Sequence, residues 1–174
     1  MADLTVRLAT EADRSALERL WLLFRHDMSE WSGTLPNPDG TFRSQRLESA
    51  LTDPDWAAYL FLSSAGGEQR PVGFAFVRDL AGPTRVLNSF FVVRGVRRGG
   101  VGLRAVAEVL ARHPGAWEVA FQDANPPAVR FWHRVAGQVA GEAWTEERRP
   151  VPGKPEVPPD VWISFTVAAD PTDR

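Results

Sequence analysis

Apolar residues recur along this chain with two spacings, one typical of strands and one typical of helices. Residues 4–8 alternate apolar and polar positions, which predicts a strand. Apolar positions between residues 16 and 28 recur every three or four residues, so a helix with one buried face is expected as far as about Met28. A loop rich in glycine and proline follows, and residues 42–51 favour a shorter second helix.

The middle of the chain changes to strand patterns. Residues 56–63 and 71–80 are apolar runs joined by a short glycine-containing turn, which predicts an antiparallel hairpin. Residues 85–93 form a third apolar run, so the hairpin is expected to extend into a three-stranded meander. This third strand leads directly into a cluster of glycines.

The last third alternates helix and strand. A helix is expected from about Leu103 to Leu110, a strand over 117–121 and a second helix over 125–137. Residues 139–145 favour another strand, 148–159 form a proline-rich connector, and 161–167 favour a final strand. The order predicts an α+β fold.

Length and composition narrow the class of protein. A chain of 174 residues is the size of one domain, which we expect to span residues 1–168 with a tail over 169–174. No run approaches the roughly 18 apolar residues that cross a bilayer, and no signal-peptide core is present, so we expect a cytoplasmic protein without membrane contact. The absence of cysteine excludes disulfides and a thiolate nucleophile. A formal net charge of −2 and the lack of an extended basic face argue against nucleic-acid binding.

The segment VVRGVRRGGVGLRAVAEVLARH carries the strongest chemical signal. It is predicted as strand, glycine loop and helix, and the unpaired N–H groups of a helix start favour an anion. Arginines surround the loop without an acid among them, namely Arg94, Arg97, Arg98 and Arg104. A phosphate-bearing ligand is therefore expected.

Three kinds of phosphate loop are considered. A nucleotide-triphosphate loop needs Gly-Lys followed by Ser or Thr, and Lys154 is the only lysine, so this type is excluded. A dinucleotide loop remains open, because Gly100, Gly102 and Ala105 fit its pattern and Asp123 follows about 20 residues on. The preceding hairpins count against it, since that loop belongs to the first turn of a βαβ series.

The third pattern is that of the GNAT acyl-CoA N-acetyltransferases, which the chain resembles. Their pyrophosphate loop has Gln or Arg, two residues, Gly, one residue, and Gly or Ala, and Arg97, Gly100 and Gly102 fill it in order. A downstream N-x-x-A-x-x-F pattern is matched by the segment NPPAVRF, residues 125–131. The resemblance covers residues 80–137 and implies a three-layer GNAT-like fold, with a mixed, mostly antiparallel sheet and helices on both faces.

The resemblance also implies a set of cofactor-binding residues for acetyl-CoA. Backbone groups of Val92 and Val93 are expected along the pantetheine arm, and Asn125 binds the arm, caps the following helix, or does both. Loop residues are expected at the pyrophosphate, and Phe131 completes the set. The loop residues are Arg97, Arg98, Gly99, Gly100, Val101 and Gly102.

The catalytic residues are less defined. Trp132 stands where the family usually has tyrosine, and an indole N–H does not usefully deliver a proton, so the acid role is in doubt. Asn88 and Ser89 occupy the region of the family's usual glutamate base. Asp27 and Glu30 are the alternatives, as a base or as groups that bind the acceptor, but a solvated helix end explains them equally well. No histidine pair at i, i+4 suggests a metal site.

The sequence thus predicts an acetyl-CoA-dependent N-acetyltransferase that acetylates a primary amine of a small molecule or peptide by direct attack in a ternary complex. A CoA-binding module that lacks catalysis and a nicotinamide oxidoreductase remain as alternatives. The acceptor stays open. A homodimer is ordinary for the resembling family, and the oligomeric state stays open too.

Overall fold

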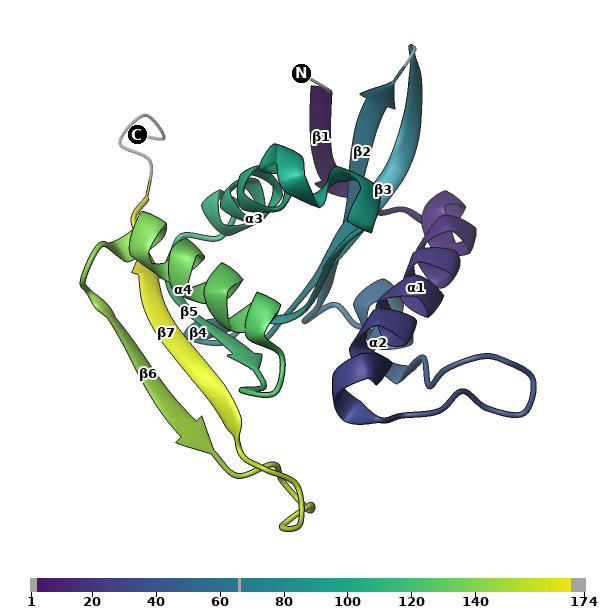
Figure 1. Ribbon diagram of the computed structural model, residues 1–174. Helices are drawn as coiled ribbons and strands as arrows, with labels where there is room; N and C mark the ends of the chain where they lie inside the picture. Colours follow the sequence, from purple (N-terminus) through teal and green to yellow (C-terminus); the bar gives the residue numbers. More distant parts are fainter. Residues whose placement is uncertain (1–2, 66, 170–174) are drawn as a thin grey trace.

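The computed structural model describes residues 3–65 and 67–169 and contains one seven-stranded sheet with four α-helices (Figure 1). The strands are β1 (Asp3–Leu8), β2 (Ala57–Ala65), β3 (Glu68–Arg78), β4 (Thr84–Val92), β5 (Gly115–Phe121), β6 (Trp144–Arg149) and β7 (Asp160–Val167). The helices are α1 (Arg14–Ser32), α2 (Gln45–Thr52), α3 (Val101–Ala111) and α4 (Pro126–Ala140), with short 3-10 helices at Glu11–Asp13 (η1) and Arg94–Gly99 (η2).

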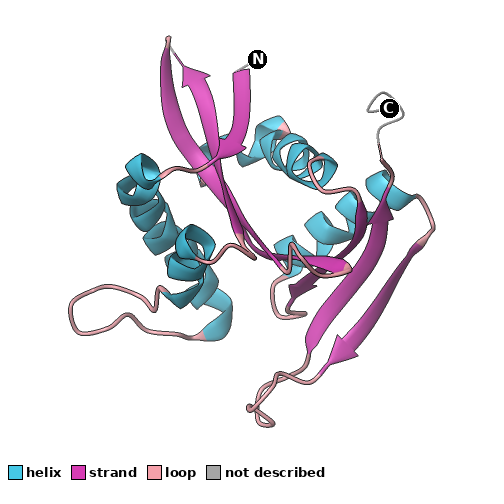
Figure 2. Ribbon diagram, turned by 180° about the vertical axis from the view of Figure 1, so that it is seen from behind, coloured by secondary structure: helices cyan, strands magenta, loops and turns pink. Residues whose placement is uncertain are grey.

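The sheet is mostly antiparallel and the fold is three-layered. Its strand order is β1-β2-β3-β4-β5-β7-β6, and only β4 and β5 run parallel. Helices α1 and α2 pack on one face, whereas α3 and α4 pack on the other (Figures 1 and 2). The expected α+β class and the mixed sheet with helices on both faces are confirmed. A single parallel pair does not supply the βαβ series of a dinucleotide-binding domain.

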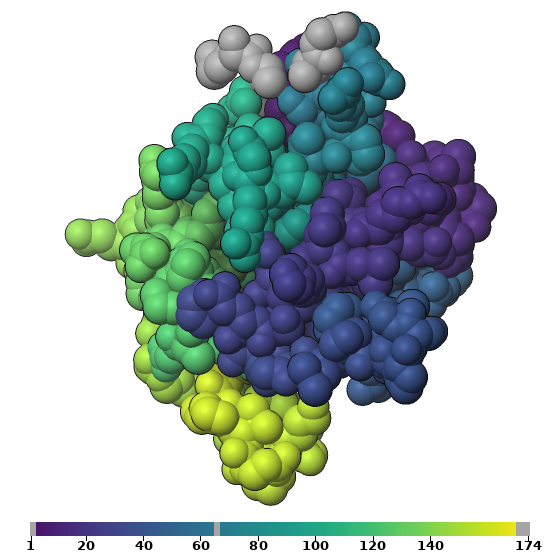
Figure 3. All heavy atoms as spheres, turned by 45° about the vertical axis from the view of Figure 1, so that its right-hand side comes forward, coloured from purple at the N-terminus to yellow at the C-terminus, as the bar shows by residue number. Residues whose placement is uncertain are grey.

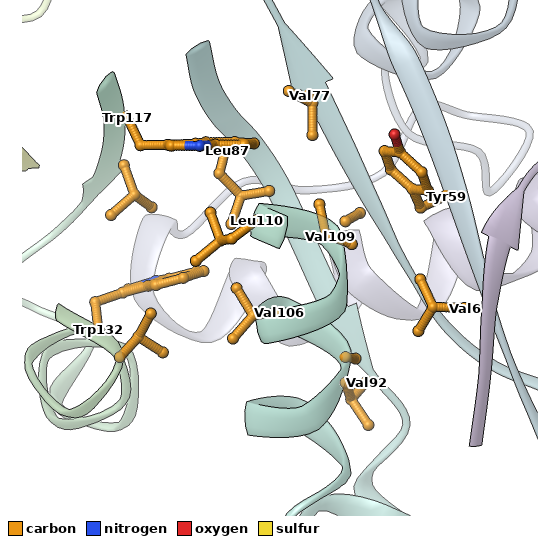
Figure 4. Packing of buried hydrophobic residues seen from close by; sticks show 14 of the residues in the cluster. Val6, Tyr59, Val77, Leu87, Val92, Val106, Val109, Leu110, Trp117 and Trp132 are labelled. Atoms are coloured by element: carbon orange, nitrogen blue, oxygen red, sulfur yellow. The ribbon is translucent and has the colours of Figure 1, made fainter. Parts of the chain in front are cut away.

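Each face of the sheet buries its own apolar cluster. Under α1 and α2, Trp21 and Phe24 pack against Phe74 and Phe76 of β3. Under α3 and α4, the cluster includes Val106, Leu110 and Trp117, and Figure 4 shows the α3 side chains directed toward the sheet. Because side chains alternate along a strand, the cluster that a residue joins tells which face of the sheet it lies on.

Several element boundaries differ from the sequence predictions. Helix α1 continues past Met28 to Ser32, and α2 begins at Gln45 instead of residue 42. The strand predicted over 139–145 is wrong: α4 extends to Ala140, and β6 covers Trp144–Arg149. No apolar pattern marks this strand in the sequence, because four of its six residues, Thr145 to Arg148, are exposed and polar.

Two further predictions concern the C-terminal tail and membrane contact. Of the expected tail, residues 170–174 lie outside the described part of the structure. Among the helices in the described ranges, none has the length and apolar character that crossing a membrane requires.

Strands β4 and β5 separate halfway along their length. Their pairing runs from Thr84 opposite Ala116 to Leu87 opposite Val119 and stops there. At the same place the β3–β4 register skips Asn88, which marks a bulge in β4. From Asn88 onward, no strand within residues 3–65 and 67–169 pairs with the edge of β4 that faces β5.

Candidate functional site

The gap between the two separating strands opens into a cavity of about 800 Å³. Its walls come from the end of α1, the second half of β4, the end of β5 and the first half of α4. Asn125 Nδ2 lies 4.0 Å from Met28 Sδ, so the end of α1 and the start of α4 meet across the gap between β4 and β5. Figure 3 shows this meeting on the surface, where the dark-blue end of α1 lies against the green of α4.

The start of α3 presents free backbone donors to one end of this region. The first bond of the helix runs from the Arg104 N–H to the Gly100 carbonyl, at 3.1 Å. The N–H groups of Val101, Gly102 and Leu103 precede it and have no carbonyl one turn earlier in the helix to receive them. Gly100 makes this entry by adopting a left-handed conformation, with φ 72° and ψ 7°. The geometry suits an anion, as the glycine loop predicted.

Arg97 bridges the strand end and α1. Its Nε donates to the Val92 carbonyl at 2.7 Å, and its Nη2 pairs with Asp27 Oδ2. Arg94 Nη2 contacts the other oxygen of Asp27 at 2.9 Å and lies 3.9 Å from Glu30. The two predicted acids and the predicted phosphate-binding arginine therefore lie together, although they are about 70 positions apart in the chain.

The pKa of Asp27 bears on its predicted role as a base. Burial by itself raises the pKa of this carboxyl, but the hydrogen bonds and charges of Arg97 and Arg94 outweigh burial and hold it below the ordinary value. A carboxylate with a lowered pKa and two arginine partners is a weak proton acceptor. The structure therefore favours Asp27 as a partner of the arginines over Asp27 as a base.

The unpaired edge of β4 offers a second row of backbone groups. The N–H of Val93 donates to the Val72 carbonyl at 2.8 Å, so it is engaged within the sheet. Because N–H groups point alternately to the two sides of a strand, those of Val92 and Phe90 point away from β3 and into the gap left by β5. Of the predicted pair, Val92 has the free donor. Phe90 joins it, which the sequence analysis missed.

Helix α4 contributes an amide and two aromatic rings. Asn125 Oδ1 accepts a hydrogen bond from the Ala128 N–H at 3.2 Å, so the predicted helix-capping role is confirmed. Phe131 stacks on Phe90 with ring centroids 5.4 Å apart, and it lies 3.2 Å from the position of a Cβ on Gly102. The glycine at position 102 thus lets the start of α3 approach α4 closely.

Trp132 lies in the wall of the cavity. Its ring packs edge-on against Phe90 and Phe131, with centroids at 5.5 and 4.8 Å. Asn88 and Ser89 line the same cavity, and the Ser89 hydroxyl donates to Asn88 Oδ1 at 3.1 Å. The position of the family's tyrosine and the region of its glutamate therefore meet at one place, without a tyrosine or a glutamate.

The structure brings most predicted residues to this cavity and leaves some outside it. Asp27, Glu30, Val92, Arg97, Gly102, Asn125, Phe131 and Trp132 line it. Val93, Arg98, Gly99, Gly100 and Val101 do not. Arg98 and Gly99 lie exposed in the 3-10 helix before α3, and Val101 packs into the core.

The cavity residues that the sequence analysis missed include four from α2, β3 and β7. Arg46 comes from α2, Arg78 from the end of β3, and Asp160 and Trp162 from β7. No sequence motif connects them, because they come from three separate elements to which the sequence analysis assigned only a structural role. Arg78 has the same alternation as Phe74 and Phe76, and Trp162 alternates with Val161 and Ile163, so these side chains lie on the α1–α2 face.

Comparisons with known proteins agree with the fold. Residues 17–137 match the sequence profile of the Acetyltransferase (GNAT) family. No curated protein matches the sequence. An acetyltransferase from Thermus thermophilus is 20% identical with a TM-score of 0.64, covering 94% of this chain and 97% of that one.

Two further similar structures hold coenzyme A. The spermidine N-acetyltransferase of Vibrio cholerae, solved with CoA and spermine, is 11% identical with a TM-score of 0.63, over 94% of this chain and 95% of that one. The PaiA N-acetyltransferase of Thermoplasma acidophilum, solved with CoA, is 9% identical with a TM-score of 0.62, over 94% and 99%. At these identities the likeness is one of fold.

Proposed function

Since this chain belongs to the Acetyltransferase (GNAT) family, we propose that it transfers the acetyl group of acetyl-CoA to a primary amine of a small molecule or peptide. One observation carries the proposal: the free edge of β4 lines the same cavity as Gly102, which belongs to the first turn of α3 with its free N–H groups. A ligand with a diphosphate at one end and an amide-bearing arm at the other matches these two rows of donors.

Different parts of the site bind different parts of acetyl-CoA. The N–H groups of Val101 to Leu103 and the charge of Arg97 bind the diphosphate. The N–H groups of Phe90 and Val92 bind the arm in the manner of an added strand, since they have lost their partner in β5. The rings of Phe90 and Phe131 cover the apolar atoms of the arm.

The reaction is a direct attack in a ternary complex. The amine nitrogen attacks the thioester carbonyl carbon, the C–N bond forms, and the C–S bond breaks as the CoA thiolate leaves. A free N–H on the β4 edge stabilises the oxyanion that develops on the carbonyl oxygen. The nitrogen loses a proton to water, because Asp27 is held by arginines and neither Asn88 nor Ser89 is basic. The thiolate takes its proton from water, since the Trp132 indole is only a hydrogen-bond donor.

A specific observation also supports a second candidate, a CoA-binding module without catalysis. The acid and base positions hold Trp132, Asn88 and Ser89, none of which transfers protons readily. Both candidates share the cofactor site and differ only in turnover.

Two measurements test the proposal. Acetyl-CoA is expected to raise the melting temperature of the protein and NAD is not, because ligands that bind the folded state stabilise it. Release of free CoA thiol is then followed over a panel of primary amines. Turnover with any amine supports the enzyme. Tight acetyl-CoA binding without turnover on the whole panel supports the module, and stabilisation by NAD but not by acetyl-CoA would refute both.

A further inference from the structure

The arginines that line the cavity differ in one respect, which is whether they have a partner. Arg94 and Arg97 pair with Asp27, and Arg78 pairs with Asp79. Arg46 also lines the cavity, but it forms no ion pair and no hydrogen bond with any residue in the ranges 3–65 and 67–169. In those ranges Arg46 therefore lines the cavity without an ion-pair partner within 4.0 Å.

The surroundings of Arg46 add to its positive charge. Although Arg46 is exposed as a residue, partial desolvation of its guanidinium lowers its pKa, the charges of Arg25, Arg78 and Arg43 lower it further, and Asp160 raises it. Arg25 is itself fixed by packing between the rings of Trp21 and Phe42, at 5.9 Å from each. This end of the cavity thus carries more positive than negative charge.

The position of Arg46 has a cost for folding. It is the second residue of α2, and a cation near the start of a helix is unfavourable against the helix dipole. No ion pair within the described chain offsets that cost, and an arginine that meets repulsion from its neighbours does not stabilise the fold. A bound anion would offset all of these terms at once.

Arg46 lies on the acceptor side of the cavity. The cofactor groups, namely the start of α3 and the α4 rings, lie on the α3–α4 face of the sheet. Arg46 comes from α2, on the opposite face, and Arg78, Asp160 and Trp162 lie on that face as well. The cavity crosses the sheet where β4 and β5 separate, so a molecule bound beside Arg46 approaches the thioester from the side away from CoA.

We propose that Arg46 binds a carboxylate on the acceptor, so that the amines acetylated by this protein are amino acids or closely related amino-carboxylates. The inference rests on the proposed N-acetyltransferase function and names its substrate class. The guanidinium takes the carboxylate in a forked pair of hydrogen bonds, and Asp160, the acid on the same side, faces the ammonium group.

The test compares amines that differ only in the carboxylate. β-Alanine is paired with n-propylamine, γ-aminobutyrate with n-butylamine, and each of a set of α-amino acids with the amine that lacks its carboxylate; spermidine serves as a polycationic acceptor. Kinetics with saturating acetyl-CoA are measured for the wild type and for Arg46→Gln, Arg46→Lys and Arg43→Gln. Arg43 is the matched control, because it carries the same charge near Arg46 and is likewise exposed, but it donates to Gln45 at 2.6 Å and does not line the cavity.

In the wild type, kcat/KM is expected to be at least tenfold higher for the best amino-carboxylate than for its partner amine. Arg46→Gln should lower kcat/KM for the amino-carboxylate roughly ten- to a hundredfold, mainly through KM, because hydrogen bonds to a charged group are lost. It should leave the partner amine and the affinity for CoA nearly unchanged. Arg46→Lys should restore part of the loss, and Arg43→Gln should change kcat/KM by less than about threefold, because Arg43 does not line the cavity.

The outcomes separate the two proposals. A preference for amines without the carboxylate, or a preference that survives Arg46→Gln, overturns the assignment of Arg46 while the acetyltransferase function stands. If acetyl-CoA binds but nothing is acetylated, the proposed function fails. The role of Arg46 is then decided by titrating the same amino-carboxylates into CoA-saturated protein: binding that Arg46→Gln abolishes supports it, and binding that is absent or unaffected overturns it.

Discussion

The substitution Gly100→Ala adds one methyl group and tests whether the cofactor loop depends on a left-handed backbone conformation at this position. Gly100 is the residue before α3 and has φ 72°, whereas an added Cβ would meet no atom within 4 Å. Replacement by alanine therefore causes no collision, and its cost is conformational. An L-residue pays about 1–2 kcal/mol in the left-handed region.

Gly99 supplies the matched control. A Cβ on Gly99 also meets nothing within 4 Å, and Gly99 lies in the 3-10 helix without a positive φ. Both glycine-to-alanine changes restrict the unfolded chain equally, an effect worth about 0.4–1 kcal/mol in favour of folding. The difference between the two variants therefore isolates the left-handed term.

The energetic cost of the left-handed conformation at residue 100 must appear as lost stability, as weaker cofactor binding, or as a combination of the two. If the loop keeps its shape, Gly100→Ala should lower the free energy of unfolding by about 1–2 kcal/mol relative to Gly99→Ala. If the loop relaxes instead, stability recovers, but restoring the donor arrangement weakens acetyl-CoA binding by about five- to thirtyfold for the same energy. The two losses together should amount to about 1–2 kcal/mol.

Urea unfolding and isothermal titration with acetyl-CoA measure the two terms on the same samples. Loss of affinity in Gly99→Ala equal to that in Gly100→Ala would show that the loop is sensitive to any side chain and not to the left-handed turn. Identical stability and identical affinity in both variants would refute the conformational argument.

Four further outcomes are expected. Asp27→Asn should tighten acetyl-CoA binding by up to about fivefold at low salt, because it removes a partly exposed ion pair, worth about 0.2–1 kcal/mol, that competes for Arg97. Weaker acetyl-CoA binding of this variant in titration would contradict the expectation. Trp132→Phe should lower stability by about 1–2 kcal/mol but leave the pH dependence of kcat unchanged, because the indole transfers no proton; a lost limb of the profile would show otherwise. Gly73→Ala should destabilise by about 1–3 kcal/mol in urea, because its Cβ would lie 2.2 Å from the carbonyl oxygen of Phe91 on the neighbouring strand. The hydrogen bond from Arg149 lowers the pKa of Glu118 despite burial, so the Glu118 carboxylate stabilises the protein at pH values above its ordinary pKa, and this stabilisation is lost as the pH falls below that value. The urea midpoint of the wild type should therefore exceed that of Glu118→Gln at pH 7, and the difference should shrink toward pH 3. A difference that stays constant with pH would argue against the ion pair.

Local patterns were sufficient for most of the framework. The alternation of residues 4–8 and the apolar run of β4 give strands, and the three-to-four spacing after Arg14 gives α1, because burial of one face imposes these periods. Strand β6 was misplaced for the same reason. It is an edge strand with a charged exterior, so no apolar period marks it.

The loop chemistry was also readable from the sequence, since its glycines, arginines and helix start are neighbours in the chain. Arg97, Gly100 and Gly102 indicated a diphosphate site because backbone conformation and helix-terminal N–H groups are local properties. What the local pattern could not give is the partner of each charge. Arg97 meets Asp27, about 70 positions earlier, only because α1 ends beside the strand that leads to the loop.

The acceptor side was decided by tertiary structure alone. Arg46 and Asp160 face one cavity because β7 inserts beside β5 and because α2 packs on the face of the sheet opposite α3. Whether an arginine is paired depends on atoms brought close by folding, and a sequence that contains many arginines gives no sign of which of the unpaired ones line a cavity. The sequence therefore determined the elements and the cofactor loop, whereas the long-range packing of the sheet determined which charges face the substrate.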